Sequence, residues 1–170
     1  MVCEVVDNRT DNIITVGRVF NIAKPYTKIN TSIINRAMIE WSDKYSVNVS
    51  IIDQEHKNFI DLVNKVIVTK RHNYSQKEVE ELLAELVKFA KEHFEMEETY
   101  MSTFKYPDYL LHYNEHLNFS LHMIIYNNQV INGEYKILDE LHKYLQEWVD
   151  YHLLTTDKKY TKCFNKHGLK

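Results

Sequence analysis

The chain has 170 residues, about the length of one domain, and its 44% hydrophobic and 26% charged residues are typical of a globular protein rather than a disordered or membrane-embedded one. Its formal net charge is −3 without a dense block of like charge, and its apolar runs are too short to cross a bilayer, so we expect neither nucleic acid nor a membrane as a partner. The 3 Gly, 2 Pro and 9 His are unusual counts. Few helix breakers predict long helices, and surplus histidine suggests a metal site.

Residues 1–40 differ in composition from the rest of the chain. Ile13, Ile14 and Val16 favour β structure, and Pro25 interrupts the segment. We expect an N-terminal extension or arm, too short to be a domain, with one or two helical turns over residues 31–38.

The two cysteines, Cys3 and Cys163, lie near opposite ends of the sequence and form neither a disulfide framework nor a CxxC motif. The N-terminus also lacks the basic and apolar regions of a secretory leader. We therefore expect free thiols in a reducing compartment and a cytoplasmic protein.

From Asp53 onward, the apolar residues recur at intervals of three and four almost to the end of the chain, which is typical of amphipathic helices. Turn signals divide this region and predict four helices, at 53–70, 75–104, 108–129 and 134–158. Short connections favour antiparallel neighbours, so the predicted fold is all-α, an up-down-up-down four-helix bundle over residues 41–160. The lysine-rich residues 161–170 are expected to form a basic C-terminal tail in solvent.

Histidines and carboxylates occur within the apolar stripes of all four predicted helices. They fall near the starts of the first and third helices and near the ends of the second and fourth, and in an up-down bundle these positions share one end. The residues are His56, His93, Glu97, His112, His116, His152 and Asp157.

The local spacings suit metal coordination. His93 with Glu97, and His112 with His116, are four residues apart, which places each pair on one face of a helix. His152 and Asp157 are five apart and would diverge on a regular helix, so joint binding predicts a π-type bulge or bend near residues 153–156.

A lone histidine on an apolar face is usually a core residue, but five histidines and two carboxylates at one level of one core point to a shared metal centre. Seven ligands imply two ions, because a structural zinc site takes four. Imidazoles with bridging carboxylates suit iron, and in principle zinc, manganese or cobalt. The low carboxylate content, compared with ferritin-like di-iron bundles, favours oxygen binding over oxygen activation.

These residues resemble the hemerythrin family over about residues 41–160. The motifs that carry the resemblance are Trp41–Tyr45 with Asp53-Gln54-Glu55-His56, then His93-Phe94-Glu95-Met96-Glu97-Glu98, then Tyr106-Pro107 leading to His112-x3-His116, and finally Trp148-x3-His152-x4-Asp157. The sequence departs from the family in its long extension before Trp41.

The resemblance implies a non-haem di-iron centre with a bridging oxo or hydroxo group. One iron would be bound by His112, His116 and His152, the other by His56 and His93, with Glu97 and Asp157 bridging both. The implied function is reversible dioxygen binding for storage, transport or sensing, with no catalytic residue, in a monomer or weak homo-oligomer. The alternatives are a di-iron oxidase or peroxidase, a nitric-oxide-handling enzyme, or iron sequestration and detoxification.

Reversible binding requires a dry pocket, and the apolar residues near the ligands are the candidates for its wall. These residues are Phe59, Phe94, Trp148, Val149 and Leu153. Glu98 is expected to be a solvated neighbour of the site, and Asp53 a helix cap or a partner of a ligand. The other four histidines are expected to bind no metal. They are His72, His122, His142 and His167.

Overall fold

A computed structural model describes residues 4–6, 13–15 and 38–170 of the chain. In the N-terminal unit, strands β1 (Glu4–Val6) and β2 (Ile13–Thr15) pair antiparallel with Val5 opposite Ile14. The β-leaning residues Ile13 and Ile14 therefore do form a strand. Except for Met38, which is not helical, the helical turns predicted at 31–38 lie outside the described residues.

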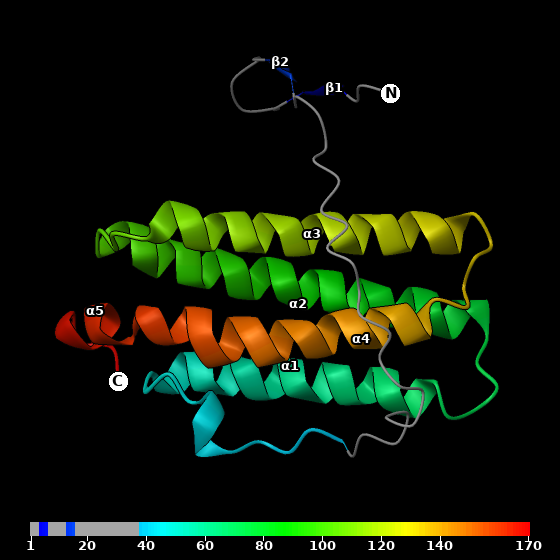
Figure 1. Ribbon diagram of the computed structural model, residues 1–170, viewed down its shortest axis with the longest axis horizontal. Coiled ribbons are helices and arrows are strands. Elements are labelled where there is room, and N and C mark those ends of the chain that lie inside the picture. Colours follow the sequence, from blue (N-terminus) through cyan, green and yellow to red (C-terminus); the bar gives the residue numbers. More distant parts are fainter. Residues whose placement is uncertain (1–3, 7–12, 16–37) are drawn as a thin grey trace, which may run out of the picture. The chain divides into compact units, whose positions relative to one another are not determined.

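Four long helices form the up-down-up-down bundle that the sequence predicts (Figure 1). They are α1 (Ser50–Thr69), α2 (Gln76–Thr103), α3 (Tyr109–Ile131) and α4 (Leu138–Trp148) with its helical continuation. The bounds of α1 to α3 lie within three residues of those predicted, while α4 begins four residues later than predicted. Helix α2 packs against α1 and α3, and α4 packs against α1.

Polar side chains fix the starts of the first two helices in different ways. Ser75 and Glu78 form a capping box at α2, with the Ser75 N–H donating to Glu78 Oε2 at 2.8 Å. Asp53 was predicted to cap α1 or to be the partner of a ligand, but it is not the N-cap of α1, and its hydrogen bonds are to other residues. It accepts hydrogen bonds from Ser46 Oγ at 2.6 Å and Val47 N at 2.7 Å, so it anchors the segment that enters α1.

The fourth helix changes its winding where the sequence predicts a bulge. After Trp148 the chain continues as the π-helix η3 (Val149–Thr156) and then as the short 3-10 helix η4 (Asp157–Lys159). A π-helical turn is wider than an α-helical one, so residues five apart come to lie above one another. The predicted π-type bulge is confirmed and is longer than the predicted segment.

The expectation that the chain enters solvent after residue 160 is wrong. Residues Thr161–Lys166 form a further helix, α5, at the end of the bundle where α1 begins (Figure 1). Its residue Phe164 is fully buried and stacks on Tyr160, with ring centroids 4.3 Å apart. The lysines that suggested a tail are on the outer side of α5, where Lys162 and Lys166 are exposed.

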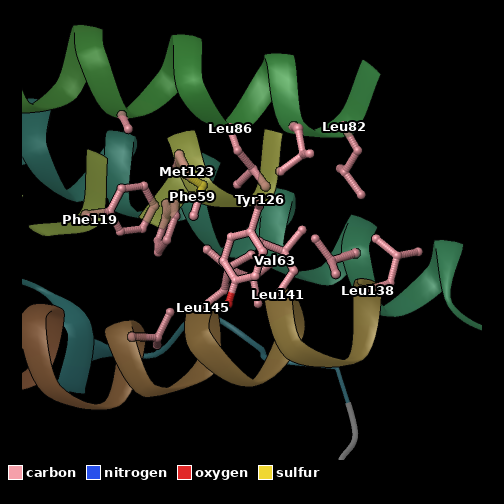
Figure 2. Packing of buried hydrophobic residues seen from close by; sticks show 14 of the residues in the cluster. Phe59, Val63, Leu82, Leu86, Phe119, Met123, Tyr126, Leu138, Leu141 and Leu145 are labelled. Carbon is pink, nitrogen blue, oxygen red and sulfur yellow. The ribbon is translucent and has the colours of Figure 1, made fainter. Parts of the chain in front are cut away.

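Aliphatic and aromatic side chains fill the half of the bundle near the α1–α2 and α3–α4 connections. Figure 2 shows Leu82 and Leu86 of α2 facing Val63 of α1 and Leu141 of α4, all of them buried. Within the part of the chain that is described, no helix is both long and apolar enough to cross a membrane.

Candidate metal centre

The fold brings all seven predicted ligand residues into one buried layer. Helix α1 supplies His56, α2 supplies His93 and Glu97, and α3 supplies His112 and His116. The continuation of α4 supplies the other two, His152 from η3 and Asp157 from η4. Each of these side chains is at most 4% exposed. Regular spacing on α1 to α3, together with the changed winding after Trp148, therefore brings residues that are distant in the sequence into a single cluster.

The donor atoms fall into two groups that share one carboxylate. Glu97 lies with His112, His116 and His152 in the first group and with His56 and His93 in the second, and within each group the donor atoms are within 4.8 Å of one another. Glu97 Oε2 is 3.3 Å from the Nε2 atoms of both His112 and His116, whereas Oε1 is 3.5 Å from His93 Nε2. The two oxygens of Glu97 thus face different groups.

Asp157, like Glu97, lies close to histidines of both groups. Its Oδ2 is 3.2 Å from His56 Nε2, and its Oδ1 is 3.0 Å from His152 Nε2 and 3.5 Å from His112 Nε2. The contact with His152 depends on the π-helical winding of η3, because an α-helix would direct two side chains five residues apart in different directions.

Two further glutamates orient histidines of the layer. Glu98 Oε1 is 2.9 Å from His116 Nδ1, and Glu115 Oε2 is 2.7 Å from His152 Nδ1. A carboxylate on the distal ring nitrogen fixes the orientation of a ligand histidine and increases its basicity. The expectation that Glu98 is merely solvated is wrong, and the sequence analysis missed Glu115. Their signal was adjacency, since Glu98 follows Glu97 and Glu115 precedes His116.

Tyr160 is a second residue that the sequence analysis missed. It is fully buried, and its hydroxyl donates a hydrogen bond of 2.5 Å to Glu97 Oε1. Burial raises the pKa of Tyr160, and the negative charges of Asp157 and Glu97 raise it further, so the phenol keeps its proton and remains a donor. Tyr160 therefore orients one oxygen of the shared carboxylate.

In the metal-free protein, contacts with carboxylates and burial shift the pKa values of the layer in opposite directions. Burial lowers the pKa of His56 and His152, but contacts with Asp157 and other carboxylates outweigh it and raise these pKa values to about 10 and about 9. Burial lowers the pKa of His93 to about 4. The neighbouring histidines hold the pKa of Glu97 well below its usual range despite burial. The layer thus contains anionic carboxylates and both charged and neutral imidazoles.

Several polar atoms of the layer make no hydrogen bond among the described residues, although His56 Nε2 and His152 Nε2 are within ion-pair distance of Asp157. They are His56 Nδ1 and Nε2, His93 Nδ1, His112 Nδ1, His152 Nε2 and both oxygens of Asp157. Buried polar atoms are normally paired, and each exception costs free energy. Cations between the two carboxylates would satisfy the Nε2 and carboxylate atoms together. A set of five imidazoles and two carboxylates suits iron or another transition metal.

A small apolar cavity of about 10 Å³ adjoins the His56 and His93 side of the layer. Four of the five predicted wall residues line it, namely Phe59, Phe94, Trp148 and Leu153. Val149 is fully buried but does not line this cavity, so its prediction as a wall residue is wrong. The sequence analysis missed the remaining apolar wall residues, which are Phe89, Ala90 and Phe119. The volume is close to the least that holds one water-sized molecule.

A comparison with models of protein families shows which family this chain belongs to. Residues 47–163 match the family model described as the hemerythrin HHE cation binding domain. The chain belongs to the hemerythrin family. The predicted resemblance is therefore confirmed.

Individual hemerythrins are similar to this chain over most of their own length. The Bacteriohemerythrin of Clostridium acetobutylicum is 27% identical over 127 residues, which cover 72% of this chain and 98% of that protein. The Bacteriohemerythrin of Stenotrophomonas maltophilia is 28% identical over 77% of this chain and 84% of its own. A crystal structure of wild-type hemerythrin superposes with a TM-score of 0.70 at 26% identity, covering 75% of this chain and 98% of that one.

The other histidines of this hemerythrin lie outside the two donor groups. His72 is 3.0 Å from Glu78 near the start of α2, and His122 stacks on Tyr144. His167 stacks on the ring of Phe104, with ring centroids 4.4 Å apart. His142 Nδ1 is 3.2 Å from the Lys70 ammonium. These four residues have surface or packing contacts, and their lack of a metal stays a prediction.

Proposed function

We propose that this hemerythrin-family protein binds dioxygen reversibly at a non-haem di-iron centre, for storage, transport or sensing. The observation that carries the proposal is the buried layer of five histidines and two carboxylates, shared as two groups and adjoining an apolar cavity. The name Bacteriohemerythrin, carried by the relatives, supports the same function.

The residues divide naturally between two ions. His112, His116 and His152 would hold one iron and His56 with His93 the other, while Glu97 and Asp157 would contact both and a bridging oxo or hydroxo group would complete the centre. The iron pair would supply the electrons that dioxygen takes up on binding and returns on release.

The side chains around the layer would make this exchange reversible. The two-histidine side has one protein ligand fewer than the other side, and the apolar cavity borders it through His56 and His93. Phe94 stacks on His116 and Trp148 stacks on His152, with ring centroids 3.8 Å and 4.1 Å apart. These rings and Leu153 would exclude water, and with it the protons that would otherwise drive irreversible oxidation.

The proposal assigns the function to the bundle of residues 41–160, with residues 1–40 as an arm and 161–170 as a C-terminal segment that closes the bundle end. It assigns no nucleophile or general base, so the protein is a binding protein rather than an enzyme. A cytoplasmic location accompanies the proposal, supported by Cys163, which is a free thiol.

The visible absorption spectrum of the iron-loaded protein tests this function. We would reduce the protein without oxygen, add oxygen, and then remove it under vacuum. A charge-transfer band that appears with oxygen and disappears on its removal is the expected result. A band that persists would favour an oxidase or peroxidase. Accumulation of ferric iron without any band would favour iron sequestration, and either outcome would contradict reversible binding.

A further inference from the structure

Helix α3 is apolar on its outer side as well as on the side that faces the bundle. On the inner side Phe119, Met123 and Val130 are buried. On the outer side several large aliphatic residues are 44% to 70% exposed, namely Leu110, Leu117, Leu121, Ile124, Ile125 and Ile131. A helix that is apolar all round is normally covered on every side. Among the described residues, the outer side of α3 therefore lacks the partner that its composition indicates.

Most of the outer residues follow a seven-residue repeat, while Ile125 and the 67% exposed Leu111 lie outside it. Leu110, Leu117, Ile124 and Ile131 recur every seven residues, and Leu121 lies at the intervening position four residues after Leu117. Gaps that alternate between four and three are the pattern of the a and d positions in a coiled coil. We call the residues at these positions, 110, 114, 117, 121, 124, 128 and 131, the outer stripe.

The two polar members of the outer stripe fit the same interpretation. Asn114 and Asn128 are exposed and occupy the same heptad position as Leu121, seven residues before it and seven residues after it. Asparagine at a few such positions restricts a coiled coil to one register and a small number of strands. The outer stripe thus has the features of a surface that recognises another helix.

Its lack of charge indicates that the other helix is a second copy of α3. The 23 residues of α3 include no Asp, Lys or Arg and a single Glu, Glu115. The carboxylate of Glu115 already binds His152. Two copies would meet without like-charge repulsion, whereas a partner selected by charge would find nothing to bind. The outer stripe is self-complementary, as a two-fold interface requires.

The exposed area is adequate for a dimer. With about 100 Å² for a whole aliphatic side chain, the exposed fractions of the six residues amount to about 340 Å² of apolar surface. Apolar atoms make up somewhat more than half of an ordinary interface, so this area corresponds to about 600 Å² per partner, which is below the roughly 800 Å² of a standard complex but in the range of a weak dimer.

We propose that the outer stripe is the interface of a homodimer in which two copies of the chain pack α3 against α3 about a two-fold axis. The interface lies on the outer side of α3, and two of its residues, Leu117 and Ile124, also line a groove that reaches His116 of the ligand layer. It would extend the heptad packing along α3 and cover aliphatic side chains that otherwise face water.

Sedimentation equilibrium of the full-length, metal-loaded protein tests the proposal. At concentrations of about 1 to 100 µM we expect a mass approaching twice the 20.4 kDa of the chain. Leu121→Lys places a charge at the middle of the outer stripe and is expected to weaken dimerisation by about tenfold or more. Val68→Lys is the matched control, because Val68 on α1 is 47% exposed and Leu121 is 48% exposed.

A mass of one chain at every concentration would overturn the proposal, and so would a dimer that Leu121→Lys leaves unchanged. Metal content and circular dichroism show whether each variant folds. If Leu121→Lys is not folded, Ile131→Lys is the second variant, because a lysine suits the C-terminus of a helix and Ile131 is 67% exposed. It is expected to weaken the dimer less than a change at the centre does, and no weakening would contradict the interface.

Discussion

The two halves of the bundle core are built by the same helices but contain opposite kinds of side chains. In the apolar half, residues such as Leu82, Leu86, Leu141 and Leu145 are fully or almost fully buried, and each such side chain stabilises the fold by about 1.5–3 kcal/mol (Figure 2). In the other half a layer of inward positions holds histidines, glutamate and aspartate, next to a smaller apolar cluster that includes Ile52, Met101 and Phe164, and a buried polar atom without a partner costs about 1–3 kcal/mol. The apolar half therefore makes the bundle fold, and the polar half is suited to what it binds.

The largest expected effect is the loss of metal from the polar half. Glu97→Ala removes the carboxylate that both donor groups share, and His116→Ala removes one nitrogen from one group, so neither variant should assemble two ions. His122→Ala is the control, because His122 stacks on Tyr144 outside both groups. Metal per chain is measured by elemental analysis. An equal loss in all three variants would contradict the assignment of these ligands.

A cavity in the apolar half should have the opposite signature. Leu141 is fully buried, so Leu141→Ala is expected to lower the free energy of unfolding by about 2–5 kcal/mol without reducing the metal content. Denaturant unfolding and elemental analysis of the same sample measure the two quantities. Loss of metal from a folded Leu141→Ala variant would mean that the two halves are not separable.

The protonation of the polar half predicts how metal affinity depends on pH. His56 and His152 have raised pKa values of about 10 and about 9, so both carry a proton at neutral pH that a metal must displace. Each displaced proton changes the affinity about tenfold per pH unit, and each donor group has one of these histidines, which predicts that from pH 8 to pH 7 each ion binds about tenfold more weakly and the pair of ions about 100-fold more weakly. Titration with Co²⁺ at both pH values measures it, and equal affinities would refute this protonation scheme.

The same two histidines make the free energy of unfolding of the metal-free protein depend on pH. Their pKa values in the fold lie above the unfolded value of 6.5. Their contribution is therefore complete below pH 6.5 and is lost as the pH rises through about 9 and 10. The metal-free form should unfold more easily in alkali than the loaded form.

A smaller effect is expected from the glutamates that orient the histidines. Glu115→Ala leaves His152 Nδ1 without its carboxylate and should reduce metal affinity by about 10-fold to 100-fold. Glu92→Ala, which changes an exposed residue of α2, should leave the affinity unchanged. Competition with a chelator measures both variants. If their affinities are the same, Glu115 does not support the centre.

The smallest expected effect concerns the cavity wall between the two halves. Leu153 is buried and lines the cavity, so Leu153→Ala should admit water and speed the oxidation of the oxygen-loaded protein several-fold. The neighbouring variant Leu154→Ala is the control, because Leu154 lies outside the wall. The decay of the visible band gives the rates. An unchanged rate in Leu153→Ala would mean that Leu153 does not exclude water.

The sequence predicted the helices and the seven-residue cluster because both depend on short-range periodicity. The spacing of His93 with Glu97, and of His112 with His116, is visible in the sequence, and short connections bring all four helix ends to one level. The five-residue interval between His152 and Asp157 even predicted the π-helix, because no regular α-helix could bring both side chains into the same layer.

Other features depended on contacts between segments that are distant along the chain. Glu98 and Glu115 have no distinctive spacing, and their roles follow from the rotation of α2 and α3 about their axes, which packing alone decides. The lysines around Phe164 concealed α5, whose burial requires the start of α1 and the end of α2 as neighbours. The sequence by itself determined which side chains share a layer, because helical periodicity is local. Only the tertiary structure decided which atoms touch, because distances between helices depend on how every side chain of the core packs.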